Sequence, residues 1–515
     1  MAKAEAVDLP LALDRAGGRR LPLGQQLVDE LRRRVQAGSL GPGERLPPVR
    51  ALAERLADTP ETVACAYRRL VEEGYLRGEV GRGTFVAAPP LHAEEDPLAP
   101  FEAGGALPPF SMPSPSAGPP AQRDLLRLAS QPGVVSFAAS VAAPELAPVA
   151  ALRDALAHVL QTEGAAALQV GATYGYSPLR GAIAELLQQR GIKTSAEVVC
   201  VTSGCQQGID LAAKVFVGAG DAVLVEQPSF LGALEAFRAR GARVVGVPIE
   251  QDGLRVDALP SLIQRHRPKL LYCMPTFQNP TGRSLSSEKR RALLRVAAAF
   301  DLPIVEDDSA GFFHLDGEAP PSLKAEDHAG YVIHLGTFSK LIAAGLRLGW
   351  LVAEPAVFEK LVAAKYASDL SSDALVQRAV FRLLADGALS SHIARVRDEY
   401  RLRRDALVSA LREHGFDAGF AVPSGGFNVW LELPPDGPTA TELYLEAIRR
   451  GVAFVPGPFF FSAGGTASPS AVRGLRLSYS ALAPAALRRG VELLAEALRA
   501  LQTDARAPRG ESVVY

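Results

Sequence analysis

The sequence predicts a multidomain protein: a small N-terminal winged helix-turn-helix unit of the α+β class, then a large α/β unit that ends in a smaller α+β subdomain. Two observations carry this prediction. Residues 87–122 contain ten prolines, three glycines and no lysine or arginine, which is typical of a linker between two folded parts. Helical and hairpin patterns precede this stretch, whereas apolar strand-like runs alternate with helical segments after it.

The chain of 515 residues divides into five expected segments. The linker, extended at ~3.1 Å per residue, could span on the order of 110 Å. The expected segments are an N-terminal arm over 1–20, the winged helix-turn-helix unit over 21–86, the linker over 87–122, the large unit over 123–503 and a flexible tail over 504–515.

Composition excludes several classes of protein. The 55 basic and 56 acidic residues give a net charge of −1, unlike a generally basic nucleic-acid binder or an acidic disordered chain. The histidines show no HxxxH pair, so no metal site is expected. No signal peptide and no apolar run of ~18 residues is present, so we expect a cytoplasmic protein. Four cysteines without CxxC spacing fit a reducing compartment: Cys65, Cys200, Cys205 and Cys273.

The small unit shows three helical patterns and a hairpin. Apolar residues recur at helical spacing from Leu23 to Val35 and again from Val49 to Leu56. Thr59 is a plausible N-cap for a third helix that begins at Pro60. Two short strands around a Gly/Arg tip follow. Two helices joined by a short turn and followed by a hairpin form a winged helix-turn-helix pattern.

Basic side chains in this unit fall where a winged helix would meet DNA. Arg50 lies on the second helix, Arg68 and Arg69 on the third, and Arg82 at the tip of the wing. The net charge over residues 1–86 is only +2 (14 basic, 12 acidic). Pattern and charge alone therefore fit DNA binding and a helical protein-contact module about equally.

A resemblance favours DNA binding. The pieces LPPVR, TV-x-x-AYRRL and G-x-GTFV occur in order, and the whole unit resembles the DNA-binding domain of the GntR family of bacterial regulators. One position departs from the family: Pro60, beside Glu61, stands where an arginine commonly reads bases, which leaves the sequence preference open. The resemblance implies DNA contacts from Arg50, Thr62, Arg68, Arg69, Arg82 and Gly83.

The large unit has seven apolar runs with strand character. They are VVCVTSG, AVLVEQP, ARVVGVPI, KLLYCMP, LPIVEDD, YVIHLGTF and LGWLVAE. A long helical stretch from about Ser372 to His414 and a smaller α+β region over 420–503 follow. Polar residues stand at several strand ends, where ligands bind in α/β sheets. Singly, each of these residues also fits a turn, a helix cap or an exposed charge.

Five short motifs that occur in a fixed order are more informative than any of these residues singly. They are SG-x-Q at 203–206, NPTG at 279–282, ED at 306–307, SK at 339–340 with an arginine seven residues after the lysine, and RLSYS at 476–480. Together they resemble the fold-type-I pyridoxal-phosphate aminotransferases over the whole unit. The resemblance implies the cofactor pyridoxal 5′-phosphate.

The resemblance also implies a role for each residue. Lys340 would form the cofactor's Schiff base, and Asp307 would keep its ring nitrogen protonated. Asn279 would donate to the phenolic oxygen and Phe230 would stack on the ring. Arg476 would clamp the α-carboxylate of an amino acid. The phosphate would lie on the amides of Gly204 and Cys205, with side-chain contacts from Thr337, Ser339 and Arg347.

Three departures distinguish this chain from active aminotransferases. Val170 stands where a tyrosine commonly reaches the partner subunit's cofactor phosphate, and Tyr174 or Tyr176 could substitute for it. Ala139-Ser140 replaces a frequent glycine pair near the substrate. Ser309, followed by Ala310, occupies the place of a tyrosine that tunes the cofactor oxygen. Groups that bind the cofactor are thus retained, and several that assist turnover are not.

The whole chain resembles the MocR (GabR-like) subfamily of transcription regulators. This resemblance implies a cytoplasmic homodimer that binds double-stranded operator DNA and senses an amino acid, an amine or pyridoxal phosphate through an aldimine on Lys340. Two alternatives remain open. One is a catalytically active aminotransferase, and the other is a regulator whose second unit has lost the cofactor. Retention of Lys340, Asp307, Asn279 and Arg347 argues against the second alternative.

Overall fold

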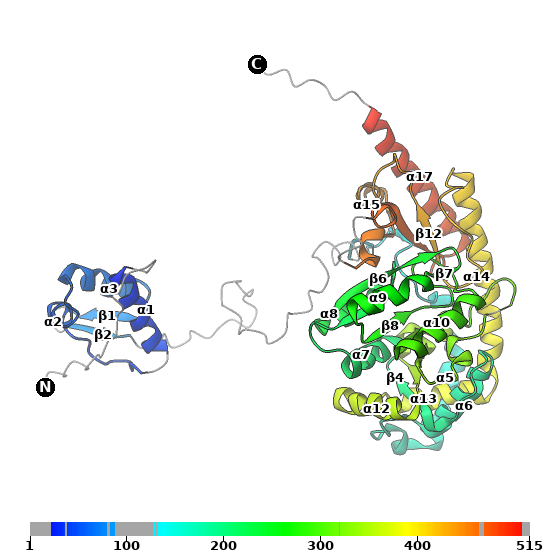
Figure 1. The fold of residues 1–515 in the computed structure, drawn as a ribbon, viewed down its shortest axis with the longest axis horizontal. Coiled ribbons are helices and arrows are strands. Elements are labelled where there is room, and N and C mark those ends of the chain that lie inside the picture. Colours follow the sequence, from blue (N-terminus) through cyan, green and yellow to red (C-terminus); the bar gives the residue numbers. More distant parts are fainter. Residues whose placement is uncertain are drawn as a thin grey trace. The chain divides into compact units, whose positions relative to one another are not determined.

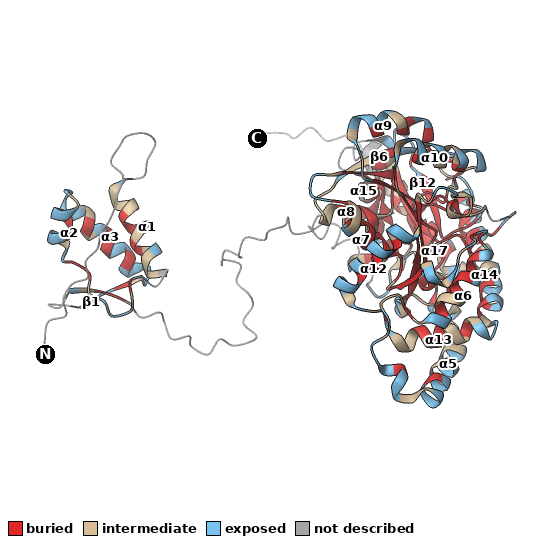
Figure 2. Cartoon of the chain, turned by 60° about the horizontal axis from the view of Figure 1, so that its bottom comes forward, coloured by how far each residue is buried: buried red, intermediate tan, exposed pale blue. Residues whose placement is uncertain are grey.

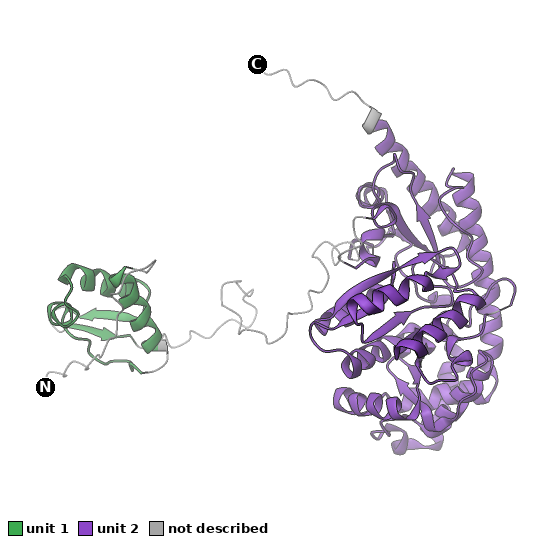
Figure 3. Ribbon diagram, viewed as in Figure 1, with its two compact units in different colours: residues 1–108 green, residues 109–515 purple. Residues whose placement is uncertain are grey.

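The computed structural model describes residues 22–36, 39–79, 83–87, 127–129, 131–318, 320–462 and 468–506 (Figure 1). The chain divides into two compact units, residues 1–108 and 109–515 (Figure 3). The expected N-terminal arm and all of the expected linker after Ala87 lie outside the described residues.

The small unit contains the three helices and the hairpin that the sequence predicts. Its strands pair antiparallel from Leu76–Val86 to Glu79–Gly83. Helical periodicity places one apolar face of each helix in a common core, which includes Leu31, Leu52 and Leu70. The elements are α1 (Leu23–Gln36), α2 (Val49–Arg55), α3 (Pro60–Glu72), β1 (Leu76–Glu79) and β2 (Gly83–Val86).

Helix α3 begins as its sequence predicts. Pro60 occupies its first turn, and the Thr59 side chain accepts a hydrogen bond from the Thr62 backbone N–H at 3.3 Å. The buried Tyr67 hydroxyl donates to the Pro47 carbonyl at 3.0 Å and ties α3 to the turn before α2. The third helix is therefore fixed at its start and at its middle.

The large unit is built on an eight-stranded sheet that contains all seven predicted runs. Its five central strands run parallel, and β11 is antiparallel to both of its neighbours. In spatial order the strands are β4 (Val199–Thr202), β11 (Gly349–Val352), β10 (Val332–Thr337), β9 (Ile304–Asp307), β8 (Leu270–Cys273), β5 (Ala222–Gln227), β6 (Arg243–Glu250) and β7 (Gly253–Leu254).

Both faces of this sheet are buried, which explains its continuous apolar runs. Alternate residues face opposite sides: Val305 packs in one cluster and Ile304 in another. On the Val305 side lie α7 (Cys205–Phe216), α8 (Leu231–Ala239) and α12 (Pro355–Asp369). On the other side lie α9 (Leu259–His266) and α10 (Ser287–Phe300). Figure 2 shows the sheet as a buried layer between helices with exposed outer faces.

Three further helices pack beside the sheet on the side of β4. Helix α13 (Ala374–Ala385) contacts both α5 (Val149–Thr162) and α6 (Ser177–Gln188). The short helix α11 (Phe338–Leu341) directly follows β10 at the carboxyl end of the parallel strands.

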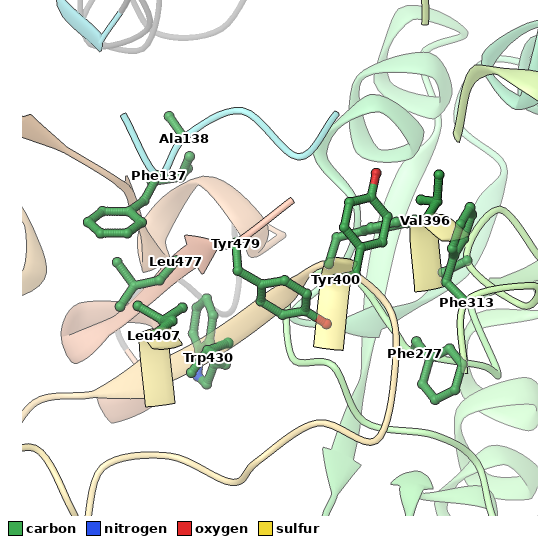
Figure 4. Packing of buried hydrophobic residues seen from close by; sticks show 14 of the residues in the cluster. Phe137, Ala138, Phe277, Phe313, Val396, Tyr400, Leu407, Trp430, Leu477 and Tyr479 are labelled. Carbon is green, nitrogen blue, oxygen red and sulfur yellow. The ribbon is translucent and has the colours of Figure 1, made fainter. Parts of the chain in front are cut away.

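The C-terminal region forms the expected smaller α+β subdomain. Its three-stranded sheet has the order β12 (Asn428–Glu432), β15 (Gly474–Ser478), β14 (Val455–Pro456). A separate parallel pair joins β13 (Val452–Ala453) to β3 (Val135–Ser136). The helices of the subdomain are α15 (Ala440–Arg449), α16 (Pro469–Arg473) and α17 (Pro484–Arg506). Figure 4 shows Tyr400 and Leu407, from the long helix before β12, packed beside Tyr479 and Leu477.

Two expectations need correction. The predicted helical stretch from Ser372 to His414 is two helices, α13 and α14 (Ala388–Glu413), because Gly387 adopts a left-handed conformation (φ 70°) that interrupts the helix. Helix α17 also continues to Arg506, three residues into the expected flexible tail. The remainder of that tail, 507–515, lies outside the described residues.

Candidate functional site

One cavity of about 460 Å³ lies at the carboxyl end of the parallel strands. Its walls come from the ends of β9 and β10, the start of α7, and strands β12 and β15 of the smaller subdomain. The structure thus brings together residues that are far apart in the sequence. Nine of the predicted site residues line it: Cys205, Phe230, Asn279, Asp307, Thr337, Ser339, Lys340, Arg347 and Arg476. Gly204, the tenth, is the N-cap of α7.

Lys340 lies on α11 with its amine in this cavity. Its Nζ donates to the backbone carbonyl of Ser140 and lies 5.4 Å from the centre of the Phe427 ring. Burial, helped by the positive charge of Arg476, lowers the pKa of the Lys340 amine to about 8. A neutral amine is the nucleophile that attacks a carbonyl, and this lowered pKa makes it accessible near neutral pH.

Asp307 ends β9 as a buried carboxylate. Tyr272 donates from its hydroxyl to Asp307 Oδ2 at 3.0 Å, and the Ser309 backbone N–H donates to Oδ1 at 3.1 Å. Burial raises the pKa of Asp307 in spite of these hydrogen bonds. No cation forms an ion pair with this carboxylate among the described residues. A protonated ring nitrogen would supply the missing partner.

A cradle suited to phosphate surrounds the start of α7. Gly204, at φ 93°, turns the chain from β4 into the helix, so the first amides of α7 are free of helical partners. Arg347 donates to the Ser203 carbonyl at 2.9 Å and to Ser339 Oγ at 3.3 Å, which holds its guanidinium beside this turn. Thr337 Oγ1 accepts from the Ser339 N–H at 3.0 Å. The free amides of α7 and the Arg347 guanidinium thus lie together at this turn.

Glycine is required where two strands meet under this cradle. A Cβ at Gly349 would lie 2.8 Å from Gly204 Cα and 2.5 Å from the Gly336 carbonyl oxygen. Only a residue without a side chain lets β11 approach the turn at this distance.

Arg476 enters the cavity from β15. Its Nη1 donates to Asn279 Oδ1 at 3.1 Å, its Nη2 donates to the Ala138 carbonyl, and its guanidinium carbon lies 5.2 Å from the centre of the Phe460 ring. Burial lowers the pKa of Arg476 to about 10. Arg476 Nε and the nearby Asn428 Oδ1 are buried without a hydrogen-bond partner among the described residues. Buried polar atoms in a cavity normally have a partner, so both point to a polar ligand there.

These groups fit pyridoxal 5′-phosphate. The cavity offers an amine for its aldehyde, a buried carboxylate for its ring nitrogen, and an arginine with helix amides for its phosphate. The orphaned atoms of Arg476 and Asn428 belong to residues that line the same cavity, so a further polar group bound there could satisfy them.

The three departures fall at different places. Ser140, Ser309 and Ala310 line the cavity, whereas Val170 is 79% exposed and lies outside it. Tyr174 stacks on Phe358 and approaches Glu359, and Tyr176 packs against Phe381 and Arg378; neither tyrosine lines the cavity of its own chain.

Sequence reasoning missed several groups of the site. Tyr272 lies in the middle of an apolar run, and nothing in that run indicates that β8 places it beside Asp307. Phe427 and Asn428 follow two glycines that could have marked them. A Cβ at Gly425 would lie 2.3 Å from the Phe277 ring, so this glycine allows Phe277 to reach the cavity.

The predicted DNA-contacting residues differ in their surroundings. Arg50 is exposed on α2, and Arg68 is exposed on α3, 3.9 Å from Glu61. Thr62 donates its hydroxyl to Asp58 at 3.1 Å within the start of α3. Gly83 begins β2 at φ 122°. Arg82 lies outside the described residues.

Arg69 has partners within the small unit. Its guanidinium donates to Glu73 at 3.0 Å and to Gln25 of α1 at 2.6 Å. These contacts tie α3 to α1 while the side chain stays exposed, and the DNA contact expected of Arg69 stays a prediction.

The comparisons with known proteins agree with both units. The bacterial regulatory protein gntR family matches residues 23–86, and the aminotransferase class I and II family matches residues 137–494. The regulator TauR of Rhodobacter capsulatus is 33% identical to this chain. The probable rhizopine catabolism regulatory protein MocR of Rhizobium meliloti is 29% identical to it. The alignments cover 93% and 97% of this chain, and 98% of each relative.

Among solved structures, LysN, an α-aminoadipate aminotransferase of Thermus thermophilus complexed with N-(5′-phosphopyridoxyl)-L-leucine, superimposes with a TM-score of 0.69 at 38% identity. The match covers 75% of this chain and 96% of LysN. A winged helix-turn-helix unit and a pyridoxal-phosphate site on one chain define a pyridoxal-phosphate-dependent, DNA-binding transcription regulator. The chain belongs to the MocR-like subfamily of the GntR regulators. No helix in the described part of the chain is long and apolar enough to cross a membrane.

Proposed function

We propose that this regulator senses an amino acid or amine through Lys340 and passes the signal to its DNA-binding unit. The carrying observation is that Lys340, with its lowered pKa, shares one cavity with Arg476, a buried guanidinium whose Nε has no partner in the described part of the chain. Such a cavity can hold the amine and the carboxylate of the same molecule. Free pyridoxal phosphate, captured by Lys340, is a second possible signal of the same site.

Pyridoxal phosphate, when bound, supplies an aldehyde for amines and a ring that withdraws electrons from the atoms attached to it. The residues of this chain hold and orient it. Lys340 would provide the amine with which an effector's amine competes. Asp307 would place its negative charge opposite the ring nitrogen. The phosphate would be contacted by Arg347, Ser339 and Thr337. Phe230 would stack on the ring, and Asn279, whose Oδ1 accepts from Arg476, would donate from its amide nitrogen.

The cavity lacks groups that assist turnover, which supports sensing over catalysis. No tyrosine is among its described lining residues, and Ser309 and Ala310 stand in the expected place of one. An active aminotransferase remains the second candidate, because the amine and both anion-binding arginines are present.

A homodimer is part of the proposal. Leu168, Val170, Tyr366 and Leu370 are large apolar residues that are 52–79% exposed. The segment around Val170 lies near the start of α13, since a Cβ at Gly171 would contact Ala374 Cβ at 3.8 Å. Exposed apolar groups of this kind favour association with another protein surface. Sedimentation analysis of the protein and of a Val170→Glu, Leu370→Glu double variant tests this. The variant should sediment with the mass of a monomer and the wild type with that of a dimer.

The effector can act only as far as its affinity differs between the DNA-binding states. The test compares DNA binding of the wild type and Lys340→Ala, each with and without pyridoxal phosphate and a pool of amino acids. We expect a response in the wild type and none in Lys340→Ala. An equal response in both proteins would refute sensing through Lys340.

A parallel assay separates the two candidates. Incubation with amino acids and 2-oxo acids should give at most one amino-group transfer per bound cofactor. Many transfers per site would make the protein an active aminotransferase.

A further inference from the structure

Two adjacent glutamines at the start of α7 have different surroundings. Gln206 lines the cavity and donates to the Gly232 carbonyl at 2.8 Å, whereas Gln207 is not among the described lining residues. The side-chain oxygen of Gln207 instead accepts a hydrogen bond of 2.8 Å from the backbone N–H of Ser203. Ser203 precedes Gly204, so Gln207 contacts the turn of the phosphate cradle from outside the cavity.

The backbone of Ser203 is held on both sides. Its N–H donates to Gln207, and its carbonyl accepts from Arg347 Nη2 at 2.9 Å. That carbonyl belongs to the same planar peptide group as the N–H of Gly204. The two hydrogen bonds therefore fix the peptide groups before and after Ser203, and with them the direction of the Gly204 amide.

Two charged residues of α12 hold the side chain of Gln207. Gln207 Nε2 donates to Asp369 Oδ2 at 2.7 Å, and Lys365 Nζ donates to the two oxygens of the same carboxylate at 2.8 and 2.9 Å. Lys365 is 0% exposed, and its Nζ also donates to Ser372 Oγ at 3.1 Å and to Gln207 Oε1 at 3.5 Å. A buried ammonium is tolerated only with such partners, so Lys365 and Asp369 form a fixed support for Gln207.

These partners allow one orientation of the Gln207 amide. Its oxygen faces two donors, the Ser203 N–H and the Lys365 ammonium, and its nitrogen faces the Asp369 carboxylate. The reversed amide would turn its N–H groups toward both donors and its oxygen toward the carboxylate. The support thus keeps an acceptor directed at the Ser203 N–H.

We propose that Gln207, held by Lys365 and Asp369, is a positioning residue for the phosphate of the cofactor. This proposal rests on the phosphate cradle of the proposed function and extends it to residues outside the cavity. The amides of Gly204 and Cys205 are held in place before the phosphate arrives, so binding does not have to order them. The effect of Gln207 should therefore fall on the phosphate and not on the ring or the aldehyde.

The test compares two ligands on the full chain freed of cofactor. They are pyridoxal 5′-phosphate and 5′-deoxypyridoxal, which has the same ring and aldehyde but no phosphate. Titrations that follow the absorption band of the bound ligand give both dissociation constants. Their ratio, 5′-deoxypyridoxal over pyridoxal 5′-phosphate, is the phosphate preference. Because both ligands are measured on the same preparation, a loss of folded protein cancels in this ratio.

Gln207→Met removes the acceptor without changing the charge. Its phosphate preference should fall roughly three- to tenfold, the effect of one hydrogen bond, while its affinity for 5′-deoxypyridoxal stays that of the wild type. A role in folding alone would weaken both ligands equally. An unchanged phosphate preference in Gln207→Met would therefore overturn the proposal.

A double variant tests the support. Lys365→Met with Asp369→Leu removes both charges together, and apolar replacement of a buried ion pair is often neutral for stability. Its phosphate preference should fall as far as that of Gln207→Met, because Gln207 is then no longer held. The wild-type preference in this variant would show that Lys365 and Asp369 have no part in positioning.

Lys214→Met is the matched control. Lys214 Nζ also joins α7 to α12, through Ser368 Oγ at 2.9 Å, and it pairs with Asp210 at 2.6 Å. Its side chain is 36% exposed, and these contacts do not include Gln207. This variant should keep the wild-type phosphate preference. An equal loss in Lys214→Met would mean that any link between the two helices has this effect, which contradicts a particular role for Gln207.

Failure of this proposal differs from failure of the proposed function. If the wild type prefers the phosphate ligand and Gln207→Met keeps that preference, only the positioning role is wrong. If the wild type forms no band, or binds both ligands equally, the proposed cofactor site itself is wrong and the positioning role fails with it.

Discussion

The Tyr272 hydroxyl donates a 3.0 Å hydrogen bond to Asp307, although the two residues lie on different strands, 35 positions apart. This hydrogen bond from the Tyr272 phenol stabilises the charged form of the Asp307 carboxylate. Tyr272 is itself fully buried, and burial and the neighbouring carboxylate both raise the pKa of its hydroxyl. Its raised pKa keeps the hydroxyl protonated, and therefore a hydrogen-bond donor, at neutral pH.

Removal of this donor should weaken cofactor binding. In Tyr272→Phe the pKa of Asp307 rises further, so less negative charge opposes the ring nitrogen. We expect the dissociation constant of pyridoxal phosphate to rise roughly three- to tenfold, the effect of one hydrogen bond. Equilibrium dialysis measures it. Tyr331→Phe removes an exposed hydroxyl that bonds Asp301 and should bind as the wild type does. Equal affinities for Tyr272→Phe and the wild type would contradict a positioning role for Tyr272.

The amine of Lys340 should react at an unusually low pH. Burial lowers its pKa from the ordinary 10.5 to about 8, so the neutral amine accumulates as the pH rises through 8. The rate at which cofactor-free protein captures pyridoxal phosphate in a borohydride-trappable form should therefore rise with a midpoint near 8. Arg476→Gln removes a neighbouring positive charge and should move the midpoint upward. A wild-type midpoint near 10.5 would show that Lys340 is not desolvated.

A buried ion pair beside the site should be costly to break. Arg190 and Asp308 are 2% and 1% exposed and form two hydrogen bonds of 2.9 and 3.1 Å. Asp308→Asn removes the ion-pair partner of the buried Arg190 and should lower the free energy of unfolding by about 3–5 kcal/mol.

The measurement is urea unfolding followed by tryptophan fluorescence. Both tryptophans, Trp350 and Trp430, lie in the large unit, so the signal reports on that unit alone. Glu492→Gln breaks an exposed pair with Arg489 and should change the stability by no more than about 0.5 kcal/mol. A similar small change for Asp308→Asn would mean that water reaches Arg190.

Two adjacent arginines of α3 should behave differently. Among the described residues, exposed Arg68 has only a long contact to Glu61, so Arg68→Ala should weaken DNA binding and reduce its salt dependence by about one phosphate contact. Arg69→Ala instead removes the link from α3 to α1 and should mainly lower the thermal stability of the small unit. Fluorescence anisotropy with a random-sequence duplex at several salt concentrations, together with calorimetry, separates the effects. The reverse pattern would show that Arg69 leaves Glu73 and Gln25 when DNA binds.

The sequence predicts local structure better than it predicts the neighbours of each side chain. All seven apolar runs are strands, because burial on both faces leaves no other pattern for them. The capping residues Thr59 and Pro60 likewise mark the start of α3 by local chemistry. The break at Gly387 was open to prediction, because the Asp386-Gly387 pair is a turn signal and the apolar positions of α14 do not continue the register of those in α13.

Tertiary contacts limit how much of the site can be predicted from the sequence. The residues that resemble a known family do meet in one cavity, although their roles there stay predictions. Tyr272, Phe427 and Asn428 could not be found in the same way, since their position depends on strand order and on the turn at Gly425. Arg69 looks identical to Arg68 in sequence, and only the packing of α1 on α3 distinguishes them.

The groups that line the cavity lie far apart in the sequence, and this has a consequence for the degradation of the protein in the cell. Ala138 and Arg476, which share a hydrogen bond, are 338 residues apart, so the cavity exists only after the whole large unit has folded. A ligand that binds only the folded chain stabilises it by mass action, by about 2.7 kcal/mol at one hundred times its dissociation constant. The supply of pyridoxal phosphate would thus govern how much of this regulator escapes proteolysis, and cofactor scarcity would reduce its abundance before any effector is encountered.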